Sequence, residues 1–336
     1  MQSCITPAVA EHLQAKGYAV VDGALPPPAA AALRSEIDAL RSADGLVRPN
    51  CTHLVRAGSA TPDLLPKSQI YEAEISLDPK ARAAAPLLAS IDADGSLGVL
   101  LSLFLPRLRL DAHGIKAQFN AGGGGAFPIH TDSEEELDGR KVTAIFYLND
   151  GWTPDHGGQL RLYPFPEAPP VDVAPLAGRL VLFSSTQMHH RVLPSRAPRY
   201  CFTAWLSQSR GRGARAGPPP APRLPPPPAD ALASGDPQAA AAARRFLLQP
   251  GIRRHVVKLV YSAEWEASLV ESHPRCEATD AALAQHREGV AVAARALAPY
   301  AGEIDRLAAA CASSGSVGGG GGGGAGGGGA AAVSWF

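Results

Sequence analysis

The chain has 336 residues, of which 46% are hydrophobic, and its 31 basic and 31 acidic residues give a formal net charge of zero. This length and apolar content allow one large or two medium domains with a real core. With this balanced charge, no strong electrostatic footprint points to nucleic acid or to acidic membranes, so neither is expected as a partner. The five cysteines are scattered without a C-x-x-C pair, which argues against a disulfide framework or a zinc module and fits a reducing compartment.

The N-terminal residues lack the apolar core of a signal peptide, and no uninterrupted apolar run is long enough to span a bilayer. We therefore expect a cytoplasmic or nuclear protein without a membrane segment.

Residues 1–114 are predicted to form an N-terminal strand and several support helices. The pattern indicates a helix over 7–16, a strand over 18–22 and a helix that starts at the prolines of 26–28 and buries Leu33, Ile37 and Leu40 at helical spacing. Residues 44–68 have the polar composition of a loop, and 71–77 are compatible with strand or helix. A further helix is predicted over 86–105, weakened in its middle by Gly95.

Residues 115–208 carry short alternating segments at 115–119, 142–148, 159–163, 179–183 and 199–206. Turn signals separate them and no helix intervenes, so they predict a mainly β protein whose core is a double-stranded β-helix, or jelly roll. The proline-rich stretch 164–175 is expected to be a loop. Gly122–Gly125 lacks the Lys-Ser/Thr and helix of a phosphate loop, so we expect a mobile loop that admits substrate. Glu134–Glu136 are expected in a solvated hairpin loop.

After the core the composition changes twice. Residues 209–240 are rich in Pro and Ala and predict a linker, and 241–314 have the apolar periodicity of a helical extension. Residues 315–336 are dominated by Gly and cannot bury enough apolar surface to fold, so a disordered tail is expected. Its last residues, Val333–Phe336, are expected to be an unstructured end rather than a docking motif.

Residues 130–199 contain the elements of a metal site. His130 and Asp132 form an H-x-D pair, and residues i and i+2 of a strand point to the same face. One imidazole of the His189-His190 doublet would complete a 2-His-1-carboxylate triad, which suits non-haem Fe(II) with O2 and a chelating cosubstrate. Arg199, nine positions beyond His190, can pair bidentately with a carboxylate. Its rivals Arg191 and Arg196 fall in or beside a predicted loop.

Six motifs follow one another in order between residues 130 and 205: His130-Thr-Asp132, Phe146-Tyr147-Leu148-Asn149, Gly157-Gly158-Gln-Leu160-Arg161-Leu-Tyr163-Pro164, Arg179-Leu-Val-Leu-Phe183, His190-Arg-Val192-Leu-Pro194 and Arg199-Tyr200-Cys-Phe-Thr203-Ala-Trp205. This series resembles the prolyl 4-hydroxylase-like group of 2-oxoglutarate/Fe(II) dioxygenases, and within that group the oxygen-sensing prolyl hydroxylases. The family's H-x-V-x-P pattern selects His190 over His189, because Pro194 lies four residues beyond it.

The resemblance implies Fe(II) on His130, Asp132 and His190, and 2-oxoglutarate and O2 as cosubstrates. It also implies that the far carboxylate of 2-oxoglutarate meets Arg199 and the Tyr147 hydroxyl, with ascorbate as a candidate further cofactor. The implied activity is hydroxylation of a protein side chain, prolyl by analogy, with release of succinate and CO2.

Two departures from the family leave the substrate contacts open, because Phe119 and Phe127 stand where relatives carry tyrosine. A protein or peptide substrate is the leading interpretation, and a small metabolite remains an alternative. A jelly-roll binding module with a non-catalytic metal site is the alternative from another class, and the intact triad and Arg199 speak against it. An oxygenase of nucleic-acid bases would need a basic groove with stacking aromatics, which the sequence does not show.

Overall fold

The computed structural model of the chain describes residues 4–54, 61–134, 138–209, 224–228, 232, 235–314 and 333–336. Its strands are β1 Tyr18–Val21, β2 Arg48–Leu54, β3 Asp63–Glu74, β4 Ala112–Asn120, β5 Gly125–His130, β6 Arg140–Tyr147, β7 Leu160–Tyr163, β8 Val171–Val173, β9 Leu180–Ser184, β10 His189–Ser195 and β11 Arg199–Ser207. Its helices are α1 Pro7–Lys16, α2 Pro27–Ser42, α3 Pro79–Ala84, α4 Pro86–Asp92, α5 Ser96–Phe104, α7 Pro237–Leu247, α8 Pro250–Val260, α9 Ser262–Ser272, α10 Glu277–Leu297 and α11 Ala301–Ser314.

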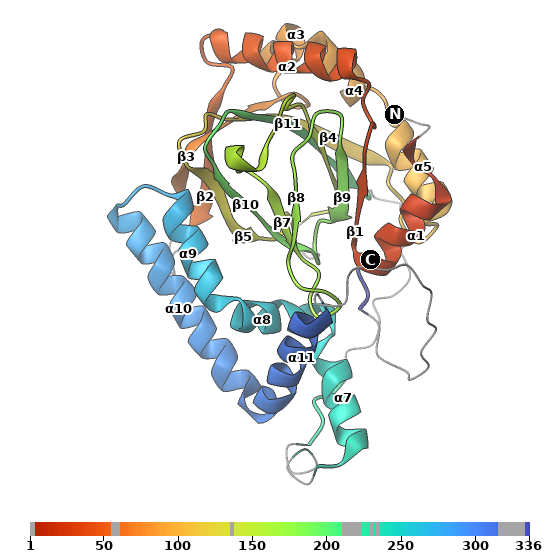
Figure 1. Cartoon of the computed structure of the whole chain (residues 1–336), viewed down its shortest axis with the longest axis vertical. Coiled ribbons are helices and arrows are strands. Elements are labelled where there is room, and N and C mark those ends of the chain that lie inside the picture. Colours follow the sequence, from red (N-terminus) through yellow and green to blue (C-terminus); the bar gives the residue numbers. More distant parts are fainter. Residues whose placement is uncertain are drawn as a thin grey trace.

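The strands form two antiparallel sheets. The larger sheet has the order β1-β9-β6-β11-β4-β3-β2, and the smaller has the order β5-β10-β7-β8. Strands β5 and β10 pair with His130 opposite His190, although they lie far apart in the sequence. Two facing sheets with helices around them are the mainly β, jelly-roll architecture that the sequence predicted (Figure 1).

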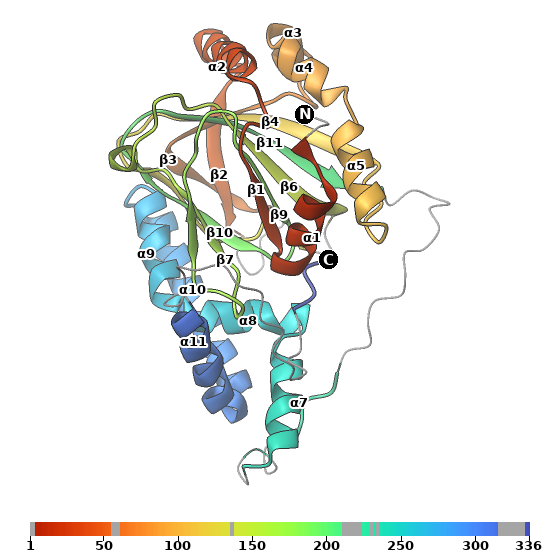
Figure 2. The same ribbon diagram turned by 45° about the vertical axis from the view of Figure 1, so that its right-hand side comes forward.

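Two apolar cores hold the sheets in place. Between the sheets, alternating inward residues such as Ile145, Leu162 and Val181 pack together. On the outer face of the larger sheet, α2 buries Ala30, Leu33, Ile37 and Leu40, which recur at helical spacing. The helices α2 to α5 lie on the side of the sandwich away from α8 to α11 (Figures 1 and 2). The sandwich is therefore supported from both sides.

The C-terminal helices have a core of their own, and α9 packs along β5. Ser268 of α9 accepts a hydrogen bond from the backbone N–H of Ile129 at 3.1 Å. Because β5 is an edge strand of the smaller sheet, this contact covers part of an edge that would otherwise be open. The helical extension therefore supports the strand that ends at His130.

Several predicted elements differ in the structure. Residues 44–68, expected as a loop, contain β2 and the start of β3, which pair into a hairpin. The expected loop 164–175 contains the short strand β8, and the ambiguous stretch 71–77 begins with the end of β3. Both β2 and β8 are edge strands, and neither carries a long apolar alternation of its own: β2 is largely exposed and β8 has only three residues.

The stretch Pro86–Phe104 is long and apolar enough to cross a membrane by length and composition alone, and it is the single helical stretch of this kind in the described part of the chain. It was expected to be one helix. The structure divides it into α4 and α5, with Gly95 at the start of α5. Leu88 of α4 and Leu101 of α5 are fully buried in the N-terminal core.

The last four residues correct the expectation of an unstructured end at Val333–Phe336, the end of the expected disordered tail 315–336. Residues 315–332 lie outside the described residues, as do most of the expected linker 209–240 and two of the three residues Glu134–Glu136. Val333–Phe336 are folded onto the protein, and Trp335 is 1% exposed. Ser184 donates a hydrogen bond to the Trp335 carbonyl at 2.7 Å, and the guanidinium carbon of Arg253 lies 4.2 Å from the centre of its ring. The terminal tetrapeptide is therefore a docked segment.

Candidate metal and cosubstrate site

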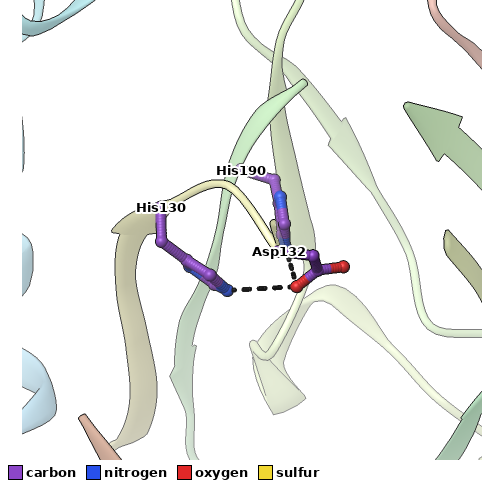
Figure 3. A group of neighbouring side chains, drawn as sticks. All are labelled: His130, Asp132 and His190. Atoms are coloured by element: carbon purple, nitrogen blue, oxygen red, sulfur yellow. Dashed lines mark ion pairs between the residues drawn. The ribbon is translucent and has the colours of Figure 1, made fainter. Parts of the chain in front are cut away.

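His130, Asp132 and His190 come together where β5 ends beside β10 (Figure 3). The Nε2 atoms of His130 and His190 each lie 3.6 Å from Oδ1 of Asp132. One donor atom from each of the three side chains lies within 4.8 Å of the others, a spacing at which all three can bind a single ion. This is the donor set of the 2-His-1-carboxylate facial triad.

Asp132 is not held in this position by a strand, as the sequence had predicted. The sequence predicted that His130 and Asp132 lie on one strand, but β5 ends at His130 and Asp132 lies beyond it. Its orientation is set instead by two hydrogen bonds to Oδ2, donated by Thr143 Oγ1 at 2.6 Å and by Trp205 Nε1 at 3.1 Å. Since both bonds go to Oδ2, the carboxylate presents Oδ1 toward the two imidazoles.

The two imidazoles are oriented in the same way. Nδ1 of His130 lies 2.8 Å from the carbonyl oxygen of Pro128, and Nδ1 of His190 lies 3.1 Å from that of Met188. A carbonyl can only accept, so each Nδ1 carries the proton and each Nε2 keeps its lone pair for a metal. The backbone of each strand thus fixes the tautomer of its own histidine.

The protonation states suit a cation. Burial, together with the charge of His130, lowers the pKa of His190 to about 4, so its imidazole is neutral at physiological pH. Burial alone would raise the pKa of Asp132, but the neighbouring His190 and His130 and the Thr143 hydrogen bond outweigh it and hold the pKa below its usual range. A carboxylate with two neutral imidazoles is the state that binds a divalent metal. These residues therefore fit Fe(II).

A second feature lies on β11 and β6. Arg199 is 4% exposed, its Nε donates to the Gly158 carbonyl at 2.8 Å, and its guanidinium carbon lies 5.0 Å from the centre of the Tyr147 ring. Within the described residues, no carboxylate forms an ion pair with Arg199. The Tyr147 hydroxyl is buried and has no hydrogen-bond partner there. Burial raises the pKa of Tyr147, so this hydroxyl stays protonated and can donate. An unpaired buried guanidinium beside an unused hydroxyl fits an incoming carboxylate.

Gly158 makes room for Arg199. Its φ is +74°, and a Cβ there would lie 2.7 Å from Oγ of Ser195 and 3.0 Å from Cδ of Arg199. A larger residue would be strained in its backbone and would displace the guanidinium. The Gly157-Gly158 turn therefore shapes the space around Arg199 and is not only a connection between strands.

A cavity of about 490 Å³ lies beside the metal residues. His130 and Asp132 line it together with Phe127 and Trp205, and the hairpin β2–β3 and strand β4 contribute further walls. The Gly122–Gly125 loop, where the sequence suggested substrate entry, is not among its lining residues. That loop is closed on Asn120, which accepts from the N–H of Gly122 at 2.9 Å and donates to the carbonyl of Gly125 at 2.8 Å. The cavity therefore lies on the side of the β2–β3 hairpin and not at the Gly122–Gly125 loop.

Three contributors to the site were not singled out from the sequence. Thr143 and Trp205 position Asp132, and Lys67 lines the cavity. Trp205 carried a signal, because it ends the R-Y-x-x-T-x-W motif. Lys67 carried none, since it fell in a stretch that resembled a loop.

The sequence and the fold of the chain are similar to those of known proteins. Residues 117–207 match the model of the 2OG-Fe(II) oxygenase superfamily. A prolyl 4-hydroxylase structure from Phytophthora capsici is 30% identical to the chain with a TM-score of 0.69, covering 92% of this chain and 93% of that one. The chain belongs to the prolyl 4-hydroxylase-like group of the 2OG-Fe(II) oxygenases.

Curated relatives of this oxygenase share its central part. Human prolyl hydroxylase EGLN3 is 39% identical over 93 residues, which is 27% of this chain and 38% of EGLN3. Human Egl nine homolog 1 is 40% identical over 97 residues, or 28% of this chain and 22% of that protein. The matched region thus spans less than half the length of these relatives.

Proposed function

We propose that the protein is an Fe(II)- and 2-oxoglutarate-dependent dioxygenase that hydroxylates a prolyl side chain of a protein or peptide, with release of succinate and CO2. The observation that carries the proposal is the cluster of His130, Asp132 and His190, whose donor atoms converge with their protons and hydrogen bonds arranged for a cation. The prolyl substrate is supported by the names of the relatives, which are prolyl hydroxylases.

The residues have separate tasks in this proposal. When bound, Fe(II) and 2-oxoglutarate activate O2 so that one oxygen atom enters a C–H bond and the other enters succinate. His130, Asp132 and His190 would hold one face of the metal and leave the opposite face open. Arg199 and Tyr147 would hold the far carboxylate of 2-oxoglutarate.

Aromatic rings around the ligands would limit the access of water. The ring centres of Phe183 and His190 are 4.5 Å apart, and those of Phe127 and His130 are 6.2 Å apart. Both phenylalanines bring apolar surface to the side of an imidazole. A water-poor site strengthens the electrostatic hold on cosubstrate and metal.

The proposal extends to the setting of the reaction. We include ascorbate as an accessory reductant, which predicts that turnover decays faster without it. We place the protein in the cytoplasm or nucleus, in keeping with four described cysteines that form no disulfide, namely Cys51, Cys201, Cys276 and Cys311. We assign residues 1–114 and 115–208 to the catalytic unit, 209–240 to a linker and 241–314 to a helical extension.

The test is to incubate the protein with Fe(II), 2-oxoglutarate and proline-containing peptides, and to measure succinate and the gain of one oxygen atom by mass spectrometry. We expect peptide-dependent succinate release in the native protein and its loss in Asp132→Ala. Turnover of free proline or a small metabolite, with none on peptides, would contradict the protein substrate. Equal succinate release by Asp132→Ala would contradict the metal site.

A further inference from the structure

Lys67 is a cation in the wall of the cavity. It is half-buried on β3, and its ammonium donates to Asn50 Oδ1 at 2.6 Å and lies 5.0 Å from the centre of the Phe127 ring. An ammonium has three donors, and within the described residues only the one to Asn50 is used. Burial lowers the pKa of Lys67 to about 8, with nearby Glu72 acting in the opposite direction, so the group is still mostly charged at pH 7.

The other strong cations of the cavity are already neutralised. Lys116 lies 3.1 Å from a carboxylate oxygen of Glu72 and 2.9 Å from one of Glu74. Arg140 donates through Nε to Asp138 at 2.8 Å. Lys67, in contrast, forms no ion pair with a carboxylate within the described residues. It is therefore the cation in this wall that is left for a ligand.

The charges around Lys67 do not balance. Glu72 and Glu74 accept from Arg48 and Lys116, and Asn50 joins Glu72 to Lys67 by hydrogen bonds on both sides. Three cations face two carboxylates in this network, which leaves one positive charge at the cavity wall. One excess charge matches a single carboxylate, whereas a phosphate dianion is usually met by several arginines.

Lys67 lies close enough to His130 to contact a peptide substrate near its reacting residue. The Lys67 ammonium is 5.0 Å from the centre of the Phe127 ring, and the centres of the Phe127 and His130 rings are 6.2 Å apart. The distance from the ammonium to the centre of the His130 ring therefore cannot exceed the sum of these two distances. Extended peptide advances about 3.3–3.6 Å per residue, so this bound corresponds to roughly three residues. A side chain near the hydroxylated residue can therefore reach Lys67.

We infer that Lys67 is a specificity-determining residue that binds the carboxylate of an Asp or Glu within about three residues of the hydroxylated position. The inference rests on the proposed function, since it concerns the substrate of the same site. The substrate class is thus an acidic peptide segment. Asn50 is a positioning residue that holds the ammonium toward the cavity, and Phe127 supplies the apolar surface against which the lysine stem and a substrate backbone can pack.

The test compares the native protein with four single-residue variants of the same chain. Lys67→Met keeps an unbranched side chain of similar size and removes its charge, Lys67→Arg restores a cation, and Lys67→Glu reverses the charge. Lys80→Met is the matched control, because Lys80 is an exposed lysine on α3. Fluorescent proline peptides are made in pairs, with Asp or Glu within three residues of the proline in one and Asn or Gln in the other. A third peptide carries phosphoserine at the same position.

Binding is measured by fluorescence anisotropy and, separately, succinate release is measured with each peptide. We expect the native protein and Lys80→Met to bind the acidic peptide roughly tenfold or more tightly than the neutral one, the usual size of a hydrogen bond to a charged group. Lys67→Met should lose this preference while binding the neutral peptide as before, Lys67→Arg should recover part of it, and Lys67→Glu should disfavour the acidic peptide.

Several results would overturn the inference: no acidic preference in the native protein, an undiminished preference in Lys67→Met, or tighter binding of the phosphopeptide than of the carboxylate peptides. The anisotropy measurement does not depend on turnover. Failure of succinate release with retained acidic preference would therefore count against the proposed reaction and not against the role of Lys67.

Discussion

Arg199 differs from its sequence neighbours in its surroundings. Arg191 is also buried, but Glu264 and Glu271 of α9 pair with it, so it has no charge to offer. Arg196 is exposed and donates to the Asp155 carbonyl. Arg199 combines burial with a guanidinium that forms no ion pair within the described residues, as the proposed role in binding a carboxylate requires.

We predict that Arg199→Ala raises the KM for 2-oxoglutarate roughly 10- to 100-fold, because a buried charge-assisted hydrogen bond is lost. Arg199→Lys should have a smaller effect, since a point charge replaces a planar fork. Steady-state kinetics with varied 2-oxoglutarate measures both, and Arg196→Ala is the control that should match the native protein. A native KM in Arg199→Ala would remove Arg199 from the cosubstrate site.

We predict that Tyr147→Phe has opposite effects on the stability of the cosubstrate-free protein and on the binding of 2-oxoglutarate. A buried hydroxyl without a partner costs about 1–3 kcal/mol, so its removal should leave the thermal midpoint of the cosubstrate-free protein unchanged or higher. The same substitution should weaken 2-oxoglutarate, because the hydroxyl finds its partner in the far carboxylate. The thermal midpoint, measured with and without 2-oxoglutarate, tests both the stability of the free protein and the stabilisation by the cosubstrate. A lowered midpoint in both states would indicate a structural hydroxyl instead.

The two histidines of the doublet point in different directions. His190 faces Asp132, whereas His189 is buried against Trp265 of α9, with ring centres 5.6 Å apart. We predict that His190→Ala abolishes Fe(II) binding and succinate production. His189→Ala should keep the metal and lower the thermal midpoint, since it removes packing against α9. Metal titration under anaerobic conditions decides between them, and the reverse pattern would shift the register of β10 by one residue.

At the scale of elements, the C-terminal extension contacts two walls of the cavity. Ser268 of α9 bonds β5 next to His130, and Thr52 of β2 lies 2.9 Å from Nε2 of His273 just after α9. Leu65 of β3 packs with Ala282 of α10. Helices α9 and α10 lie along this side of the sandwich in Figure 1. The extension thus holds both the metal strand and the β2–β3 hairpin, and with the hairpin the position of Lys67.

We predict that Ser268→Ala lowers both stability and metal affinity. The buried N–H of Ile129 would lose its acceptor, at a cost of about 1–3 kcal/mol, and the end of β5 would be less well fixed. Ser272→Ala is a matched control, because the Ser272 hydroxyl donates to the carbonyl of Ser268 within the same helix. Denaturant unfolding and metal titration measure the two effects. Equal effects of the two substitutions would show that only the helix, and not its bond to β5, matters.

At the scale of the whole molecule, the sequence predicted what repeats locally or follows a motif. The strand alternation around Val142 and the helical spacing of Leu33, Ile37 and Leu40 correspond to real elements, because their burial follows from their own periodicity. The residue types of the metal cluster could also be selected from the spacing of His130 and Asp132 and from the resemblance.

The structure added what depends on contacts between distant segments. Asp132 is oriented by Thr143 and Trp205 rather than by its own strand. The sequence also could not predict whether Lys67 forms an ion pair, since this depends on where Glu72 and Asn50 lie in space. Charge and hydrogen-bond balance are properties of a neighbourhood in space, so they could not be predicted from spacing alone.

Trp335 is a further residue whose contacts with distant parts of the chain could not be predicted from the sequence. Its ring packs against Gly17, where a Cβ would come within 2.3 Å of it, and against Arg253, which also donates to the carbonyls of Phe165 and Gln187. The Trp335 carbonyl accepts from Ser184, the residue before Ser185, whose hydroxyl contacts that of Thr143 beside Asp132. A four-residue terminus thereby joins α1, β9 and α8 close to the metal residues.

We predict that Trp335→Ala destabilises the protein by about 3–5 kcal/mol, the usual cost of removing a large buried aromatic side chain. Deletion of residues 333–336 should cost at least as much, because the bond from Ser184 is lost as well, and both variants should weaken metal binding through Ser184 and Ser185. Ser334→Ala is the control, since Ser334 is exposed and, among the described residues, its hydroxyl bonds only to the carbonyl of Phe336. Chemical denaturation measures the free energies of unfolding, and a native value for Trp335→Ala would mean that the terminus contributes nothing to the folded state in solution.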